Sequence, residues 1–259
     1  TFDLYRRNNY DLIGVVTTQG INRETSSYGN VASMRSHGEE LSISTTNIKN
    51  KDFSWTTNFI YSHAVNKVTD LKSLASTMDY VSGSGFAKVG YPVRALFSIP
   101  FVGLSEDGYP MFINDKGNVT VGDINFQERE NNDYLKYEGP TDPVYTGSLG
   151  NIFTYKGFRL NVFITYSFGN VVRLDPVFSS RYTDLSSLTK EFKNRWVLPG
   201  DEAITNVPVL ISKREYRDNN DLIYAYNAYN YSTERVAKGD FIRMKEISHG
   251  YEFPSKWFK

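Results

Sequence analysis

Alternation of apolar and polar side chains with a two-residue period is the dominant pattern in this chain. It is clearest over residues 158–168, where one face carries Phe158, Leu160, Val162, Ile164, Tyr166 and Phe168. The other face carries Arg159, Asn161, Thr165 and Ser167, with Phe163 as the apolar exception. Residues 145–155 alternate in the same way, and only Lys156-Gly157 separates the two segments. Because glycine accepts the positive φ that a two-residue turn needs, the pattern predicts a β-hairpin.

A second hairpin is predicted from residues 40–47 and 54–63, which the short polar stretch 48–52 connects. With their flanking residues these strands are expected to cover 31–47 and 54–66. Two further strands are predicted, at 1–13 and 238–253. The last one alternates poorly, because Arg243 and Lys245 share a face with Phe241 and Ile247.

The connections between the predicted strands alternate in length. Residues 48–52 and 156–157 are short turns, whereas 14–30, 67–144 and 170–236 are long excursions. If the six strands run alternately up and down, every long connection lies at the same end. An outer-membrane barrel has short periplasmic turns and long extracellular loops, and a soluble domain rarely needs such long structureless loops. The lengths therefore favour a barrel wall over a soluble sandwich or propeller, which also alternates.

Composition supports the same fold class. The 259 residues include 19 Tyr and 17 Phe, and barrel strands concentrate aromatics at both membrane interfaces. No run approaches the roughly 18 apolar residues of a membrane-spanning helix, so a helical membrane protein is excluded. Six strands are too few to close even the smallest barrel, which takes about eight. We expect an all-β chain, residues 1–259, forming part of a large antiparallel transmembrane barrel. Residues 1–8 alternate like a strand and show no signal peptide, so both ends are expected to be internal to a longer protein.

Charge and motif content exclude several functions. The 29 basic and 29 acidic residues balance, and no basic cluster indicates nucleic-acid binding. Absence of cysteine excludes a Cys metal site, a disulfide and a Cys nucleophile. Carboxylate pairs such as Glu39-Glu40 and Glu128/Glu130 are expected by chance among 29 acids. No catalytic or nucleotide-binding motif is present. We therefore expect no enzyme activity, no cofactor and no metal.

Several short motifs follow one another in the order and spacing of a known family. They are Asn9–Ile13 (NYDLI), Tyr28–Met34 (YGNVASM), Ser36–Leu41 (SHGEEL), Phe53–Trp55 (FSW), Tyr155–Phe158 (YKGF), Asn194–Trp196 (NRW) with Pro199–Glu202 (PGDE), Gly239–Lys245 (GDFIRMK) and Gly250–Pro254 (GYEFP). Over nearly the whole chain this series resembles the SusC/RagA-like TonB-dependent receptors of Bacteroidetes outer membranes. Two positions depart from that pattern. Glu39 stands where the family has an aliphatic residue, and the family's acidic loop is reduced to Asn114–Asn118, which puts a loop cation site in doubt.

The resemblance implies a multi-pass outer-membrane barrel of about twenty-two strands that imports large nutrients, glycan or peptide. It places this chain in the C-terminal half of the barrel, short of the last few strands. The plug and the segment that TonB pulls lie outside the chain. The implied partners are a SusD-like surface lipoprotein acting as a lid, TonB, the cargo and outer-membrane lipid. A dimer of receptor–lipoprotein pairs fits the same resemblance.

Two groups of residues are candidates for contact with cargo or lid. Asn194, Arg195, Trp196 and Asp201 lie in the 170–236 loop, where Trp offers a stacking surface and Arg a planar fork of donors. The alternative is a folded loop in which Trp196 packs and Pro-Gly turns. Loop 67–144 is expected to share these contacts. The second group is Glu40, Asn58, Arg159 and Asn161. These residues are expected to face the barrel lumen, where they line a polar passage or simply form hydrogen bonds with the plug and with water.

Other residues receive structural interpretations. Trp55, Tyr155, Tyr166 and Phe168 are expected in the interfacial aromatic belts.

Two functional alternatives remain for the whole chain, a secreted β-rich carbohydrate-active enzyme and a β-rich surface adhesin. The distinguishing feature is a band of outward apolar side chains about 25 Å tall. A second sheet packed on Phe158, Leu160, Val162 and Ile164 would exclude the barrel.

Overall fold

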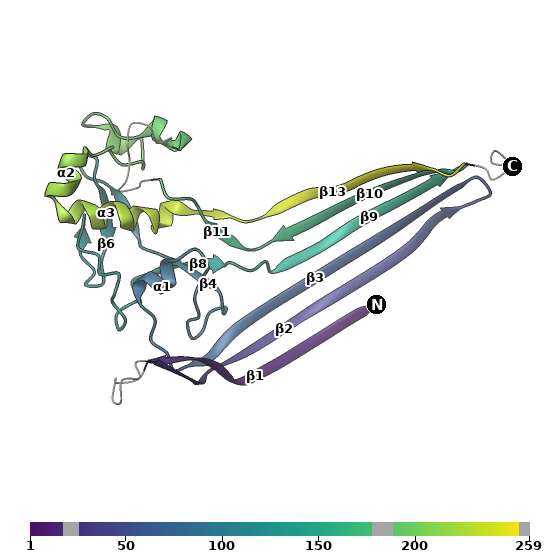
Figure 1. Cartoon of the computed structure of the whole chain (residues 1–259), viewed down its shortest axis with the longest axis horizontal. Coiled ribbons are helices and arrows are strands. Elements are labelled where there is room, and N and C mark those ends of the chain that lie inside the picture. Colours follow the sequence, from purple (N-terminus) through teal and green to yellow (C-terminus); the bar gives the residue numbers. More distant parts are fainter. Residues whose placement is uncertain (18–25, 178–188, 254–259) are drawn as a thin grey trace.

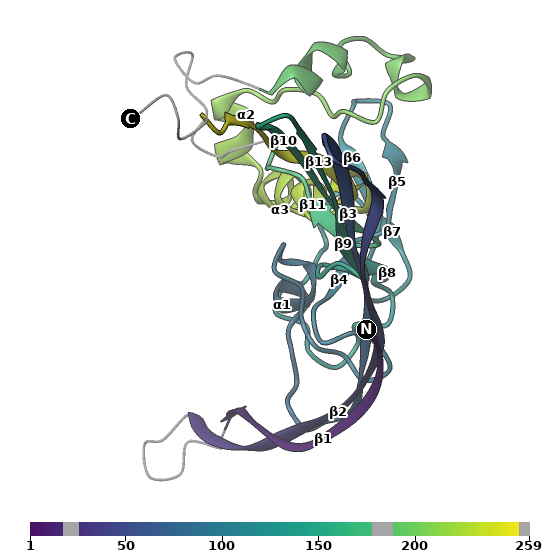
Figure 2. The same cartoon turned by 90° about the vertical axis from the view of Figure 1, so that its right-hand side faces the viewer.

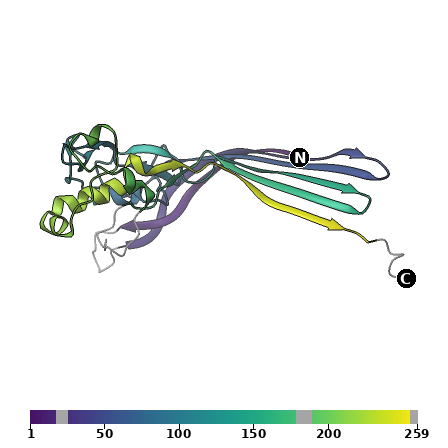
Figure 3. The same ribbon diagram turned by 90° about the horizontal axis from the view of Figure 1, so that it is seen from above.

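The structure consists of a long six-stranded sheet with a folded module at one end (Figures 1 and 3). It is a computed structural model that describes residues 1–17, 26–177 and 189–253. Parts of two predicted long connections, 18–25 and 178–188, and Pro254 of the last motif lie outside the described residues.

The sheet is antiparallel throughout, in the order β1-β2-β3-β9-β10-β13. The predicted all-β class, the six strands and both hairpins are confirmed. The strand bounds are β1 (Phe2–Thr17), β2 (Ser26–Lys49), β3 (Phe53–Leu71), β9 (Tyr145–Tyr155), β10 (Phe158–Phe168) and β13 (Phe241–Tyr251). Both short turns lie at the end of the sheet opposite the module, and the sheet is curved when it is viewed along its strands (Figures 1 and 2).

Both short turns owe their shape to local residues. In the β9–β10 turn, Lys156 has φ 46° and Gly157 φ 88°, the pair of positive φ angles of a tight type I′ hairpin turn. In the β2–β3 turn the side-chain oxygen of Asn50 accepts hydrogen bonds from the backbone N–H of Asp52 at 3.1 Å and Phe53 at 2.8 Å. Each turn fixes the register of the strands on either side.

A β-bulge explains the poor alternation of the last strand. Phe163 of β10 pairs with Glu246 and the next residue, Ile164, pairs with Met244, so Lys245 is an extra residue. A bulge of this kind moves the following residues to the other face. It brings Ile242 and Met244 onto the same face as Ile247, although the sequence period separates them.

One face of the sheet is an apolar band. Its central row is made by Ile43, Phe59, Leu149, Ile164 and Met244, which pair successively across β2, β3, β9, β10 and β13. Phe158 is 50 % exposed and Leu160 38 %, and β10, which carries both, runs clear of the module (Figure 3). No second sheet covers these side chains within the described part of the chain. The feature that would have excluded a barrel wall is therefore not found among the described residues.

Aromatic residues close the apolar band at both ends. Near the short turns Trp55 stacks on Phe153 at 5.7 Å, and Phe158 lies 4.4 Å from Tyr251 between ring centroids. At the module end His63 stacks on Tyr145 at 4.8 Å and Tyr166 on Phe168 at 5.5 Å. Ten residues separate Phe158 from Phe168, about 33 Å along a strand. At the tilt of about 40° usual in barrels this spans about 25 Å, the height of a membrane band.

A polar side chain within the apolar band has internal partners. The side-chain oxygen of Asn151 accepts hydrogen bonds from the Trp55 indole N–H at 2.9 Å and the Thr57 hydroxyl at 2.8 Å. Such bonds replace those that water would supply, which is what a hydrocarbon environment requires. The opposite face is mainly Ser, Thr, Asn and charged residues.

The module is built from short strands and helices of the long connections. Its elements are α1 (Thr77–Val81), β4 (Ala95–Ser98), β5 (Phe101–Leu104), β6 (Pro110–Ile113), β7 (Val119–Thr120), β8 (Lys136–Pro140), β11 (Val171–Arg173), α2 (Lys213–Asp218), α3 (Asn220–Asn230), β12 (Val236–Lys238) and three single-turn 3₁₀ helices, Lys190–Asn194, Asp201–Ala203 and Thr233–Arg235. Fully buried Phe97, Phe112, Val81 and Ile99 form the centre of its core. Among the described residues, no helix combines the length and apolar character needed to cross a bilayer.

Candidate functional site

The module joins the two longest connections of the chain into one body. Residues of 67–144 and 170–236 share a single buried core that includes Tyr80, Phe97 and Tyr229. The sequence predicts these stretches as long connections between strands. In the structure they instead fold compactly around a shared core. They are therefore preorganised surfaces rather than free loops.

Arg173 at the end of β11 ties the two connections together. Its guanidinium donates to the carbonyl oxygens of Ser232 at 2.8 Å, Val81 at 3.1 Å and Phe97 at 2.7 Å. Burial lowers the pKa of Arg173 to about 10, so the side chain keeps its charge at neutral pH. A charged donor to three carbonyl groups fixes α1, β4 and the segment just after α3 relative to one another.

Trp196, a candidate contact residue, lies in a folded turn. Its side chain is only 9 % exposed and its indole N–H donates to Glu202 at 2.9 Å. The ring lies on Gly108, where an added Cβ would come within 2.5 Å of it. Trp196 thus packs inside a folded loop, which is the alternative that the sequence analysis gave for this motif. Contact of its ring with cargo stays a prediction.

The acidic residues of the same motif hold the turn. The Asp201 carboxylate accepts the backbone N–H of Val197 and Leu198, both at 2.9 Å. These two bonds lower the pKa of the Asp201 carboxyl group, and the bond from Leu198 has the largest effect. The hydrogen bond from Trp196 is the main cause that lowers the pKa of Glu202. Asn194 and Arg195 are exposed beside this turn.

The tip of the turn presents apolar side chains to solvent. Val197 is 55 % exposed, Leu198 66 % and Ile204 84 %. We call Val197, Leu198 and Ile204 the apolar tip.

The predicted lumen residues share the polar face but do not form one site. Asn58 and Phe163 belong to one row of paired residues, Asn161 to the next, and Arg159 to the one after that. Glu40 lies further along the sheet, opposite Ser62. Asn58 accepts a hydrogen bond from Ser44 at 2.8 Å, and Asn161 donates one to Glu246 at 3.1 Å. Their role in lining a passage stays a prediction.

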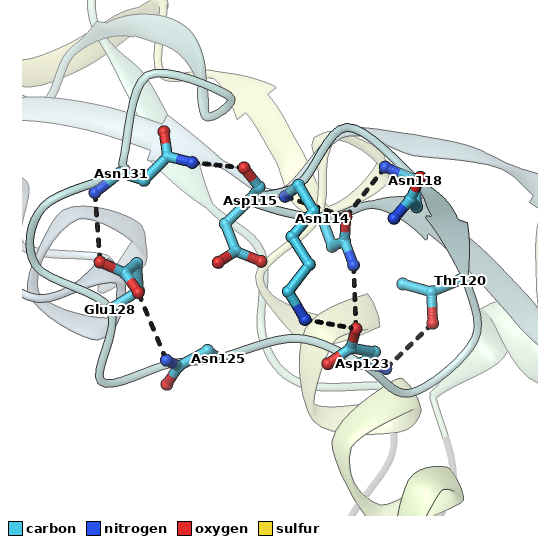
Figure 4. A network of polar contacts seen from close by, with 9 residues as sticks. Asn114, Asp115, Asn118, Thr120, Asp123, Asn125, Glu128 and Asn131 are labelled. Carbon is cyan, nitrogen blue, oxygen red and sulfur yellow. Dashed lines mark hydrogen bonds and ion pairs between the residues drawn. The ribbon is translucent and has the colours of Figure 1, made fainter.

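A polar network surrounds Asn114–Asn118, the reduced loop named in the sequence, between β6 and β7 (Figure 4). Asn114 is 1 % exposed; its side-chain oxygen accepts the backbone N–H of Lys116 at 3.1 Å and Asn118 at 2.9 Å. Its amide nitrogen donates to Asp123 at 3.1 Å. The Lys116 ammonium lies 3.3 Å from the same carboxylate. An internal cation thus balances Asp123, and the described residues contain no group of three or more His, Cys, Asp or Glu fit to hold a metal ion.

An open groove of about 820 Å³ lies beside this network. Residues 120–127 form one wall, and Asp221 and Tyr224 of α3 form the other. Gly122 lets the two walls meet, because a Cβ there would come within 2.6 Å of Asp221. Tyr224 is 49 % exposed. The groove therefore offers carboxylate and amide groups together with an exposed aromatic ring.

Helix α3 is an element that the strand pattern did not predict. Its buried residues Leu222, Ala225, Tyr226 and Tyr229 follow a helical spacing, and Asn219 caps it by accepting the N–H of Asp221 at 3.1 Å. Both signals are present in the sequence, in residues 219–229. They identify the helix but not the groove that it lines, which depends on residues a hundred positions earlier.

Relatives of known name match this chain along most of its length, although no protein-family model matches it. TonB-dependent receptor P39 of Formosa agariphila is 24 % identical over 86 % of the chain and 24 % of its own length. TonB-dependent receptor SusC of Bacteroides thetaiotaomicron is 25 % identical over 98 % of the chain and 24 % of its own length. This chain thus spans about a quarter of the curated relatives that it matches.

A solved structure described as the RagAB peptide transporter has the same fold. It superposes with a TM-score of 0.70 at 19 % identity, covering 99 % of this chain and 27 % of its own. The RagAB peptide importer in an open-open state gives 0.69 at 20 % identity. The resemblance to SusC/RagA-like receptors that the motifs indicated is confirmed at the level of sequence and fold. The named relatives are receptors and transporters rather than enzymes.

Proposed function

We propose that this SusC/RagA-like chain forms part of the wall and the extracellular surface of a TonB-dependent outer-membrane importer. The observation that carries the proposal is the apolar band, closed by aromatics at both ends, on a sheet whose two longest connections, as far as the structure describes them, fold into the module at one end (Figure 1). That arrangement suits a bilayer, and the likeness to TonB-dependent receptors over 98 % of the chain supports it.

The orientation follows from the connections. The module lies outside the cell and the turns at 50–53 and 155–158 face the periplasm, since outer-membrane barrels have long extracellular loops. Residues 1–259 belong to the C-terminal half of a barrel of about twenty-two strands. Plug and TonB-contacting segment are supplied by other parts of the protein, so energy coupling is not performed by these residues.

The apolar tip is a contact for a SusD-like lid lipoprotein. Val197, Leu198 and Ile204 provide the apolar centre, and exposed Asn194 and Arg195 provide polar contacts at its rim. A protein interface is usually built this way. Asp201 and Glu202 act indirectly, by holding the turn that presents the tip.

The cargo is an oligosaccharide or a peptide that meets the groove beside α3. Asp123, Asn125 and Asp221 can accept or donate hydrogen bonds, and the exposed Tyr224 ring can stack on a sugar or an apolar side chain. The work is binding and gating without chemistry. A carbohydrate-active enzyme or an adhesin remains as an outcome of the experiment below.

The proposal is tested on the native protein in its host. We expect it in outer-membrane fractions, soluble only with detergent and with heat-modifiable gel mobility. Deleting its gene should abolish uptake of either labelled oligosaccharides or labelled peptides, and depleting TonB should have the same effect. Uptake independent of TonB, or full solubility of the native protein, would contradict the proposal. Hydrolysis of the oligosaccharides by the purified protein would favour the enzyme, and unchanged uptake after deletion of its gene would favour the adhesin.

The lid contact has its own test. Leu198→Asp in the native protein should weaken co-purification of the lipoprotein by at least tenfold, as expected for a residue central to an interface. Val119→Asp, at a position that is 62 % exposed on β7, is the matched control and should have no effect. Equal loss in both variants would point to general damage of the module rather than to a contact.

A further inference from the structure

The outward face of the sheet changes character just beyond the apolar band. The last aromatic row contains His63, Tyr145 and Phe168. The next rows of the β2–β3 pair on that face are His37 with Val65, and then Arg35 with Lys67. Arg6 of β1 pairs with His37 and extends the same basic surface. The face that is apolar in the band thus becomes basic within four residues.

Arg35, His37 and Lys67 line a pocket of about 460 Å³. Its wall includes Arg35, His37, Lys67, Thr69, Gly90 and Pro92. The segment with Gly90 and Pro92 is fixed beside β3, because Gly90 N–H donates to Val68 at 3.0 Å and Val68 N–H donates to Tyr91 at 2.9 Å. The backbone N–H of Val93 donates to the Asn66 side chain at 2.8 Å. The pocket is therefore held by backbone bonds and is not an accident of side-chain positions.

The charge in the pocket is uncompensated within the described part of the chain. Arg35 donates through Nε to the neutral Asn8 side chain at 3.1 Å, and neither Arg35 nor Lys67 forms an ion pair with another described residue. The pocket lining contains no carboxylate. Asp70 lies one row further out, opposite Ser33, and Glu39 lies in the last aromatic row, 3.7 Å from His63. An anion entering the pocket would meet two permanent positive charges.

The height of the pocket matches the lipid headgroups. Arg35 and Lys67 lie four residues beyond the row of Glu39 and His63, about 13 Å along the strands and about 10 Å higher at the usual tilt. Headgroups extend roughly 5–8 Å beyond the hydrocarbon on each side. Arginine and lysine side chains lean several ångströms toward such a boundary, so both charges reach the headgroup phosphates.

We propose that this pocket binds the phosphate-bearing headgroup of an outer-leaflet lipid. The Arg35 fork and the Lys67 ammonium supply the contacts that a phosphate prefers. The pocket is on the face turned away from the lumen, so imported cargo does not reach it. The inference rests on the proposed membrane location, and it adds a lipid ligand that steadies the wall where the module begins.

The test uses the purified native protein in detergent and native mass spectrometry with added lipid A. Wild type should bind bisphosphorylated lipid A and should bind its phosphate-free form far more weakly. Arg35→Gln/Lys67→Gln should weaken binding about 30-fold, at roughly fivefold per basic side chain near a membrane surface. Arg7→Gln/Lys51→Gln also removes two basic charges. Arg7 lies on the opposite face of β1 and Lys51 lies in the β2–β3 turn at the other end of the sheet, so this control should retain binding.

Three results would overturn the inference. They are unchanged binding in the Arg35/Lys67 variant, equal loss in the control, and binding of inorganic phosphate as tight as that of lipid A, which would mean a free-anion site. Outer-membrane location and uptake are measured in the same strains. If the protein is in the outer membrane and uptake is normal, but the Arg35/Lys67 variant still binds lipid A like wild type, only this inference is wrong. If the native protein is absent from the outer membrane, both the proposed function and this inference are wrong.

Discussion

A charge placed in the centre of the apolar band should show whether that face meets hydrocarbon. Ile43 belongs to the central row and is 42 % exposed; Ile60, one row away on the polar face, is 49 % exposed. The two residues have the same side chain, similar exposure and nearly the same height. Replacing each by arginine therefore changes only the medium that the charge enters.

We expect Ile43→Arg to cost roughly 2–4 kcal/mol of folding free energy, the usual penalty for Arg on the lipid face near the midplane of a barrel. This corresponds to a roughly 30- to 700-fold shift in the folding equilibrium. Ile60→Arg, whose guanidinium enters water on the polar face, should cost little.

The assay is guanidinium unfolding of the native protein in phosphocholine vesicles, followed by tryptophan fluorescence, with the fraction assembled in the outer membrane as an independent readout. Equal costs for Ile43→Arg and Ile60→Arg would refute a lipid-facing band. A larger cost for Ile60→Arg would assign the lipid to the opposite face.

The remaining predictions concern the module, followed by hydrogen exchange of its peptides in the native protein. Arg173→Met removes a charged donor from three carbonyl groups and should destabilise the module by roughly 3–5 kcal/mol. The control Arg94→Met, at an exposed ion pair with Asp142, should cost at most about 1 kcal/mol. Equal effects of the two substitutions would contradict the role assigned to Arg173. Gly108→Ala combines a φ of +79° with a clash against Trp196, whereas Gly117→Ala has a φ of +76° and open space, so the first should cost about 1–3 kcal/mol more. The pKa values of Asp201 and Glu202 are lowered in the folded turn, so their stabilisation is present above the ordinary carboxyl pKa and lost as the pH falls through the lowered values. Exchange in residues 194–205 should rise on acidification, and Asp201→Asn should flatten that rise.

The strands could be predicted because each depends on local alternation. Residues 145–155 and 158–168 were predicted with the bounds that β9 and β10 have, since the period of two and the Lys156-Gly157 turn lie within one short stretch. The last strand does not show this period, because the bulge at Lys245 shifts it, and the bulge depends on the pairing of Phe163 with Glu246 on another strand.

The module could not be predicted in the same way. Its stability depends on contacts between distant residues, such as Thr77 with Asn132 at 2.6 Å and Arg173 with Phe97 at 2.7 Å. Local sequence does not reveal such pairs, so the long connections looked structureless. The motif at 194–202 was identified, but whether Trp196 stacks on cargo or packs internally depends on Gly108, which is far away in sequence.

The central claim, that one face of this sheet meets lipid and the other water, is tested most directly by scanning β10 with spin labels. The chain has no cysteine, so single cysteines at 159–167 each give one label within it. In native outer membranes we predict that labels at 160, 162, 164 and 166 are accessible to oxygen, and that those at 159, 161, 165 and 167 are accessible to a water-soluble nickel complex. Accessibility without a two-residue period, or contact of both faces with water, would contradict the barrel wall.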